Sequence, residues 1–270
     1  MATFYDTHAH LDYPDFAADI LQVIERAAAA GIAKMISVGI DLESSRRAVR
    51  LAEQYPQIFA AAGVHPNHAH QAPDDVRPAL RELAKHPKVV ALGEMGLDFY
   101  RLPSKESGGS AADDEISKRQ QARIFEQQLE VAAETGLNCI IHQRDSLEET
   151  LAQMRPWAGK TGAVFHCFTN DADVMRRLIG LGYLVSSTGI MTFKNAQNIR
   201  DTLAATPLDK FMLETDCPYL TPEPHRKVRR CEPMFIEAIA QRAAQVKGCS
   251  LEQLSRATTA TAHSFFPKMV

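Results

Sequence analysis

Short apolar runs rich in β-branched residues alternate with longer helical patterns along almost the whole chain, and this rhythm restricts the fold more than any other feature. Between the runs, apolar residues recur at helical spacing, as in the segment 20–27. Alternating strands and helices of this kind form parallel sheets of the α/β class. The runs that we predict as strands are residues 4–9, 33–38, 58–64, 89–94, 137–142, 163–168, 183–187 and 211–214.

Two architectures fit this alternation, the (β/α)8 TIM barrel and the open doubly wound sheet. The count of strands favours the barrel, and no G-x-G-x-x-G or P-loop motif of a nucleotide-binding open sheet follows the first run. A chain of 270 residues is ordinary for an α/β barrel. We therefore predict a TIM barrel in a single domain, residues 1–270, with a mobile polar loop at 102–118 and two closing helices after Pro233.

Bulk composition limits the classes of partner. The formal net charge is −3, so attraction to nucleic acid or to an anionic membrane would need a local patch of basic residues. Five cysteines without a C-x-x-C pair argue against a disulfide framework and a cysteine-built zinc site, and they favour the cytoplasm. The N-terminal segment lacks the apolar core of a signal peptide, and no apolar run reaches membrane-spanning length. We expect no membrane association and no obligate protein partner.

The opening stretch YDTHAHLD, residues 5–12, carries two histidines and two carboxylates. In a strand, side chains alternate between faces, so His8 and His10 share one face with Asp6 and Asp12. A lone His-x-His pair is common on protein surfaces. Whether this stretch is part of a site therefore depends on which polar residues the other predicted strands carry.

Polar residues also stand at the ends of most of the other predicted strands. They are His65 at the third, Glu94 at the fourth, His142 at the fifth, His166 at the sixth and Asp216 at the eighth. Each alone could be a hydrogen-bonded core histidine or a helix cap. In a parallel barrel, however, the carboxyl ends of all strands open onto one face, where these groups would desolvate one another unless a cation held them.

Imidazole and carboxylate donors without thiolates suit divalent ions such as Zn²⁺, Mn²⁺, Ni²⁺ or Mg²⁺. Six ligands are too many for one tetrahedral ion but fit two ions that share a bridging ligand. We assign His8, His10 and Asp216 to one ion, His142 and His166 to the other, and Glu94 to both. Two ions roughly 3.5–4 Å apart can activate a shared water, which is the chemistry of hydrolysis.

Several motifs resemble those of the TatD family of metal-dependent deoxyribonucleases, within the amidohydrolase-like barrels. They are DTHAHLD, GVHP, ALGEMGLDFYR, IIHQRDS, FHCFTND, GIMTFKNAQ and LETDCPYLTPEPHR, which together span most of the chain in order. The resemblance implies that the same six residues bind metal, that Glu94 takes the place of a bridging lysine, and that His65 lines the substrate site. The chain departs from the family pattern after PHR, where it reads KVRRCEP, and at Thr261.

Three further features concern the substrate. Arg144 lies two residues after His142 and could bind a phosphate bidentately or pair with Asp145 or Glu148. The basic loop HRKVRR, which includes Arg226, follows the eighth strand, where it could contact a phosphate backbone or simply be solvated surface. Tyr100 and Phe99 could stack an unpaired base or pack locally.

The resulting hypothesis is a metal-dependent deoxyribonuclease that acts as an exonuclease on single-stranded or frayed DNA ends. Its expected catalytic residues are Glu94, Asp216 as proton acceptor and His65, and its expected phosphate-binding residues are His65, Arg144 and Arg226. Two alternatives stay open. One is a hydrolase of small cyclic amides, lactones or phosphoesters, which faster turnover of such substrates would favour. The other is a non-catalytic barrel that binds nucleic acid or protein, which chelator-sensitive turnover would exclude.

Overall fold

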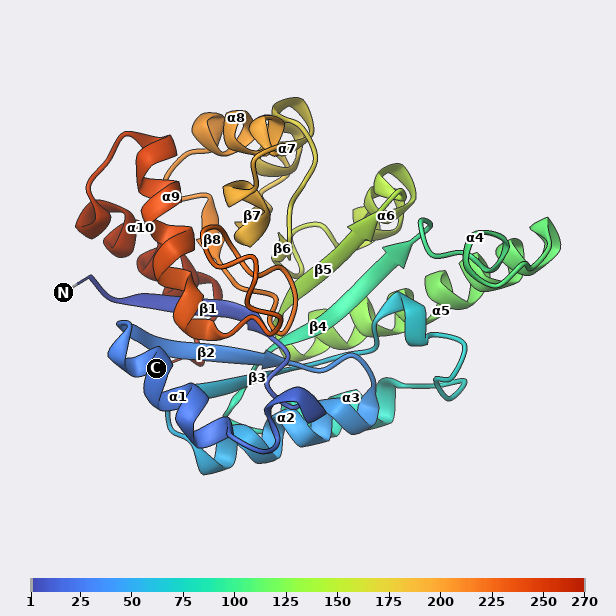
Figure 1. Cartoon of the computed structure of the whole chain (residues 1–270). Coiled ribbons are helices and arrows are strands. Elements are labelled where there is room, and N and C mark those ends of the chain that lie inside the picture. Colours follow the sequence, from blue (N-terminus) through green and yellow to red (C-terminus); the bar gives the residue numbers. More distant parts are fainter. Residues whose placement is uncertain (1, 270) are drawn as a thin grey trace.

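Eight parallel strands form one sheet whose spatial order follows the sequence, β1 to β8 (Figure 1). The computed structural model describes residues 2–269. The strands are β1 Phe4–Ala9, β2 Ile32–Val38, β3 Ile58–Ala62, β4 Val89–Asp98, β5 Asn138–Arg144, β6 Ala163–Phe165, β7 Leu184–Ser187 and β8 Phe211–Leu213. The sheet curls into a nearly closed ring, so the predicted TIM barrel is confirmed.

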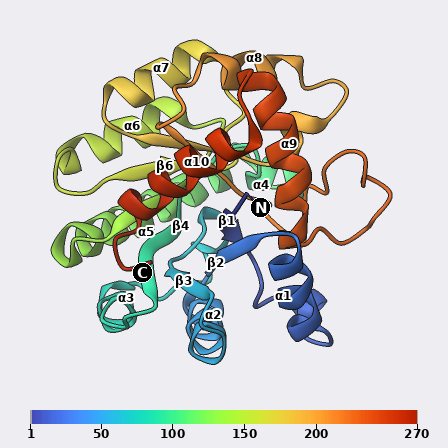
Figure 2. The same cartoon turned by 90° about the vertical axis from the view of Figure 1, so that its left-hand side faces the viewer.

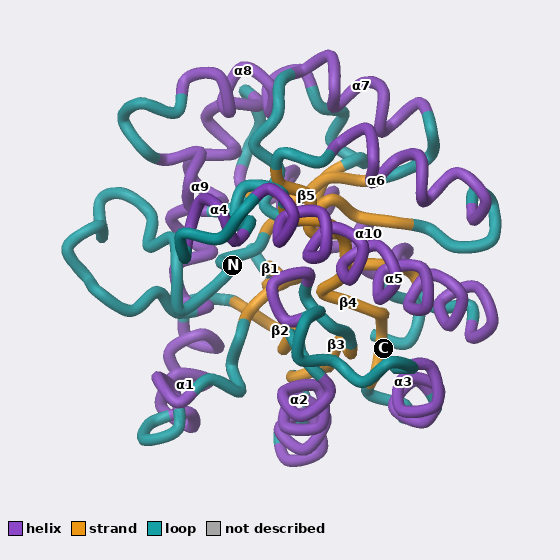
Figure 3. Tube along the Cα trace, turned by 90° about the vertical axis from the view of Figure 1, so that its right-hand side faces the viewer, coloured by secondary structure: helices purple, strands orange, loops and turns teal. Residues whose placement is uncertain are grey.

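Helices surround this ring and lie at its two ends. They are α1 Ile20–Ala29, α2 Leu42–Gln54, α3 Arg77–Ala84, α4 Pro103–Glu106, α5 Ala111–Thr135, α6 Leu147–Met154, α7 Ala172–Gly180, α8 Gln197–Ala205, α9 Ile236–Lys247 and α10 Leu251–Phe265. Figure 3 looks onto the end of the barrel toward which β4 and β5 run, where α4 and several long loops lie in front of the strands. None of the helices described is both long and apolar enough to cross a membrane.

The segment 102–118, predicted as a mobile loop, is mostly helical, so that prediction is wrong. Pro103–Glu106 forms α4, and α5 begins at Ala111. Ser110 caps α5: its side chain accepts the N–H of Asp113, whose carboxylate in turn accepts the N–H of Ser110. The polar composition of this segment therefore reflects a capped, solvent-exposed helix start.

The ring closes between β1 and β8 at the carboxyl end of the barrel. The Asp216 N–H donates to the His8 carbonyl at 2.9 Å, and the His10 N–H donates to the Cys217 carbonyl at 2.8 Å. A single parallel bridge pairs Ala9 with Cys217. The backbone of residues 8–10 and 216–217 thus forms the seam between the first and last strands.

The core has two parts. A large cluster fills the space between the strands and the outer helices, and a smaller one lies inside the ring, where Ile36, Phe59 and Val90 are all buried. The C-terminal part of α10 contributes to this inner cluster through Phe265, and Phe266 follows directly. In Figure 2, which faces the end opposite to that of Figure 3, α10 crosses the middle of the view in front of the strands and so covers the amino end of the barrel. This end is therefore filled with apolar side chains.

Candidate metal centre

The six side chains that we expected to bind metal all lie at the carboxyl end of the barrel. His8 is in β1, His10 directly follows β1, Glu94 is within β4, His142 is in β5, His166 directly follows β6, and Asp216 follows β8. Residues from five strands or their following turns thus meet at one face, as expected from the parallel arrangement.

The sequence predicts that the fourth strand ends at Glu94. In the structure β4 continues past it to Asp98, alongside β5. The register of this pair shifts between Leu92 and Met95, so Glu94 sits at an irregularity of the ladder. Irregularities of this kind re-aim a side chain. Gly93 precedes it with a φ of +143°, and a Cβ there would lie 2.7 Å from the Ile140 carbonyl oxygen. Only glycine fits this position.

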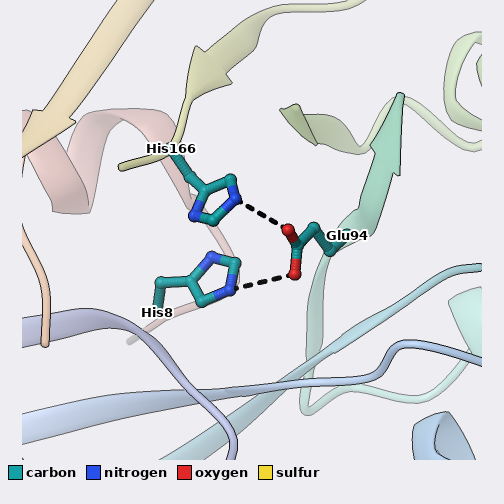
Figure 4. Close-up of side chains that lie close together, drawn as sticks. All are labelled: His8, Glu94 and His166. Atoms are coloured by element: carbon teal, nitrogen blue, oxygen red, sulfur yellow. Dashed lines mark ion pairs between the residues drawn. The ribbon is translucent and has the colours of Figure 1, made fainter. Parts of the chain in front are cut away.

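The two carboxylate oxygens of Glu94 face different histidines. Oε1 lies 2.8 Å from Nδ1 of His142 and 2.7 Å from Nε2 of His166. Oε2 lies 3.3 Å from Nε2 of His8 and 3.9 Å from Nε2 of His10. Figure 4 shows Glu94 reaching toward His8 with one oxygen and toward His166 with the other. Glu94 therefore stands between two sets of histidines.

Asp216 completes the group on the His8 side. Its Oδ1 lies 3.7 Å from Nε2 of His8 and 3.4 Å from Nε2 of His10. The residue adopts a φ of +59°, a left-handed conformation that Asp tolerates better than most residues. The preceding Thr215 is fixed by the buried Asp6, which accepts its N–H at 2.9 Å and its hydroxyl at 2.6 Å.

The two acids of the opening stretch therefore do not join the histidines. Asp6 holds the turn before Asp216, as described above. The buried Asp12 accepts two hydrogen bonds from the guanidinium of Arg47, at 3.2 and 3.0 Å. Of the two histidines and two acids in that stretch, only His8 and His10 face the centre.

The donor set fits divalent cations. Three overlapping groups have ligand atoms within 4.8 Å of one another: His8 with Glu94 and His166; His8 with His10 and Asp216; and His65 with Glu94 and His142. Neither ring nitrogen of the buried His8 has a hydrogen-bond partner among the described residues. Buried polar atoms without a partner are costly, and a cation would satisfy them.

His65 points to the same centre but offers a proton rather than a lone pair. Its Nε2 lies 3.2 Å from Nδ1 of His142 and 3.4 Å from Oε1 of Glu94. Its Nδ1 accepts the N–H of Asn67 at 3.0 Å, so in the neutral ring the proton is on Nε2. Burial lowers the pKa of His65 well below the ordinary value, which keeps the ring neutral.

Both acids of the centre are ionised. Burial alone would raise the pKa of Glu94, but the neighbouring imidazoles, His166 first, outweigh it and hold this pKa well below the ordinary value. Burial would likewise raise the pKa of Asp216, but its hydrogen bond to His10 and the nearby His8 lower it. Burial disfavours the charged form of His166, yet the carboxylates of Glu94 and Glu214 raise its pKa well above the ordinary value. The centre thus pairs ionised carboxylates with imidazoles, and ionised carboxylates attract a divalent cation.

Comparison with known proteins identifies the family. A family model described as TatD related DNase matches residues 5–267. The chain belongs to this family. As a TatD-type protein it is a metal-dependent hydrolase.

Relatives match this chain over nearly its full length. The "Uncharacterized metal-dependent hydrolase YabD" of Bacillus subtilis (strain 168) is 35% identical over 263 residues, which are 97% of this chain and 98% of the relative. The "3'-5' ssDNA/RNA exonuclease TatD" of Citrobacter rodentium is 36% identical over 267 residues, covering 97% of each chain. The crystal structure of YJJV, a TatD homologue from Escherichia coli K12, superposes with a TM-score of 0.87 at 28% identity and covers 98% of both chains.

Arg144 of this TatD chain lies at the end of β5 beside the centre. Its guanidinium carbon stands 3.7 Å from the centroid of the Tyr100 ring. Within residues 2–269 it forms no ion pair with Asp145 or Glu148, since Glu148 pairs with Arg177 and Asp145 lies 3.9 Å from Lys105. The structure therefore does not bear out the alternative in which Arg144 makes a local salt bridge.

Arg226 packs against other residues of the fold. Its guanidinium carbon stands 4.0 Å from the centroid of Phe193, and its Nη1 donates to the Thr221 carbonyl at 3.1 Å. Arg230 in the same loop is bound by the carboxylates of Asp19 and Glu232. Two arginines of the basic run, Arg226 and Arg230, therefore already have partners within the fold.

Asp98 was missed by the sequence reasoning. It is buried at the end of β4, and its Oδ2 lies 3.1 Å from Nε2 of His142. The signal was its spacing from Glu94, since residues an even number apart on one strand share a face. Because the sequence predicts that the strand ends at Glu94, this spacing did not place Asp98 on the same face.

Proposed function

We propose that this chain is a metal-dependent exonuclease that hydrolyses phosphodiester bonds at single-stranded or frayed DNA ends. The observation that carries the proposal is the division of the two Glu94 oxygens between two sets of histidines, which suits a carboxylate shared by a pair of cations. Relatives named 3'-5' ssDNA/RNA exonuclease support nucleic acid as the substrate. The five cysteines are free thiols, which supports a reducing cytoplasm.

The proposed ligands form two sets joined by Glu94. One ion would be held by His8, His10 and Asp216. The other would be held by His142 and His166, whose Nδ1 and Nε2 atoms lie 3.3 Å apart, and Glu94 would contact both ions. Zn²⁺, Mn²⁺, Ni²⁺ and Mg²⁺ are the candidates, since no thiolate enters the set. When bound, such ions supply a nucleophilic water at neutral pH and stabilise charge on the reacting phosphate.

The protein's own groups then perform the remaining steps. Asp216 directs Oδ1 toward His8 and His10, and we assign the proton of the attacking water to its other oxygen. The lowered pKa of Asp216 keeps it ionised, as a proton acceptor must be. His65 presents its Nε2–H to the centre and can donate it to a phosphate oxygen.

Arg144 is the proposed phosphate clamp on the side of β5. It is exposed, whereas the stack on Tyr100 leaves its planar fork ordered for a bidentate contact. Tyr100 itself is 47% exposed, so bases next to the cleaved bond could pack against this pair. Arg226 is a weaker candidate for a phosphate further along the strand, because its guanidinium already packs on Phe193.

A cavity that begins at Pro66, next to His65 in the sequence, offers room for part of the substrate strand. It has a volume of about 640 Å³ and lies between residues 66–70 and the helices α4 and α5. Asn67, His70, Arg101 and Gln120 supply polar groups to its wall. Asn67 also donates its backbone N–H to Nδ1 of His65, so one wall residue of the cavity contacts a residue of the proposed phosphate site.

The proposal is tested with metal-depleted protein to which each candidate ion is returned. We expect stepwise shortening of end-labelled single-stranded DNA, slower attack on blunt duplex, and complete loss with chelator. Labels at the 3' and the 5' end give the polarity, and matched RNA tests the sugar. Glu94→Ala should be inactive, whereas Glu134→Gln, on the outer helix α5, should match wild type. Metal-dependent nuclease activity that persists in Glu94→Ala, or faster turnover of lactones and cyclic amides than of DNA, would refute the proposal.

A further inference from the structure

Asp98 is held rigidly at the end of β4. Its Oδ1 accepts the backbone N–H groups of Tyr100 and Arg101, each at 3.0 Å. Gln121 of α5 accepts the Asp98 N–H at 2.9 Å and donates to its carbonyl at 3.1 Å. One carboxylate oxygen and the backbone are thereby fixed, and Oδ2 is left for His142.

His142 lies between two carboxylates that approach different ring nitrogens. Nε2 is 3.1 Å from Oδ2 of Asp98, and Nδ1 is 2.8 Å from Oε1 of Glu94. An ionised carboxylate only accepts hydrogen bonds, so Glu94 favours a proton on Nδ1 when no cation is bound, and Asp98 favours a proton on Nε2 in either state. With that proton in place, the lone pair of a neutral ring is on Nδ1 and faces the centre.

We propose that Asp98 is a positioning residue that fixes the ring and the tautomer of His142 for metal binding. The inference rests on the proposed ligand set. Metal-binding histidines usually donate their second N–H to a carboxylate or a carbonyl, and His10 does so through Nδ1, which lies 3.0 Å from the Val38 carbonyl.

His65 shows the opposite arrangement. Its outer nitrogen accepts a backbone N–H, so its proton points inward, next to the lone pair of His142. The hydrogen-bond partner on the outer side of each ring therefore sets its role. Asp98 makes His142 a metal ligand, and the Asn67 N–H makes His65 a hydrogen-bond donor.

Asp98→Asn is the decisive variant because it keeps the size of the side chain. Two backbone N–H groups hold the amide oxygen in the Oδ1 position, so the amide NH₂ must face His142. Nε2 would then accept, and the proton would move to Nδ1, where it blocks a metal. We expect the affinity for Zn²⁺ to fall by about 10- to 100-fold. Asp98→Ala, which imposes no tautomer, should lose less affinity although it loses more of the turn.

The measurements are Zn²⁺ affinity by competition with a chromogenic chelator and ¹⁵N NMR of the histidine rings in the metal-free protein. Asp98→Asn should show His142 protonated on Nδ1 alone, whereas wild type should carry a proton on Nε2. Asp41→Asn is the matched control, because Asp41 also accepts a backbone N–H, from Ser44 at 2.6 Å, but contacts none of the six proposed ligands. A merely structural role predicts the reverse ranking, with Asp98→Ala the weaker binder.

Wild-type Zn²⁺ affinity in Asp98→Asn, or a proton still on Nε2 of His142, would overturn the inference. A further variant separates this failure from a failure of the proposed function. If His142→Ala binds metal as tightly as wild type, the proposed ligand set is wrong. If His142→Ala loses metal and Asp98→Asn does not, only the role of Asp98 is wrong.

Discussion

Glu94 contacts both sets of histidines, so Glu94→Gln should prevent the binding of both ions. A neutral amide keeps the volume of the side chain but removes the charge that faces four imidazoles, at 2.7 to 3.4 Å for His166, His142, His8 and His65. Asp216→Asn removes only the contacts to His8 and His10 and should spare the ion on the other side.

The expected rise in Tm on metal binding follows from mass action. An ion present at 100 times its dissociation constant stabilises the folded state by about 2.7 kcal/mol, so two ions contribute about 5 kcal/mol. In a chain of this length, 1 kcal/mol raises Tm by about 2 °C. Metal should therefore raise the Tm of wild type by about 10 °C, that of Asp216→Asn by about half as much, and that of Glu94→Gln hardly at all.

The assay is thermal unfolding followed by circular dichroism, with and without chelator, together with metal analysis of the same samples. Glu134→Gln serves as the control for loss of an acid, since its carboxylate pairs with Arg81 on the outer surface. The reasoning would be refuted if Glu94→Gln kept a metal-dependent rise in Tm, or if Asp216→Asn lost as many ions as Glu94→Gln.

Three further predictions concern other parts of the molecule. Arg144→Ala should raise KM for single-stranded DNA by about 10-fold or more and reduce its salt dependence by about one phosphate contact, and Arg144→Lys should restore only the salt dependence. Burial raises the pKa of Asp6 from 3.8 to about 7, so its contribution to stability is present below about pH 4 and is lost as the pH rises through 7. The free energy of unfolding of chelator-treated Asp6→Asn should therefore vary less than that of wild type over this range, as urea titrations at each pH would show. Phe266→Ala, at a fully buried position under the barrel, should cost about 3–5 kcal/mol in urea unfolding without changing the metal content.

The barrel was predictable because short apolar runs mark the strands and segments with apolar residues at helical spacing lie between them. The convergence of His8, Glu94 and His166 followed from topology alone, since parallel strands end on one face. What the sequence did not reveal is the length of β4. Glycines at 93 and 96 suggest a break, whereas pairing with β5 carries the strand past them to Asp98. Tertiary pairing thus overrides the local preference of glycine.

The same limit applies to side chains whose partners lie far away in the sequence. Arg144 could be assigned to its acidic neighbours along the chain, but it packs on Tyr100, which the adjacent strand brings next to it. The polar segment 102–118 looked like a loop because exposed helices and loops share a composition, and only the cap at Ser110 distinguishes them.

The joint between the first and last strands has a consequence for how this protein responds to metal starvation. His8 and His10 belong to one side of that joint and Asp216 to the other, and few backbone hydrogen bonds hold the two sides together. A cation bound by all three residues would cross-link the first strand, β1, to the segment that follows the last strand, β8, much as a disulfide does. Depletion of that cation would then loosen amide protection first along β1 and β8, while the opposite wall of the cylinder stayed protected.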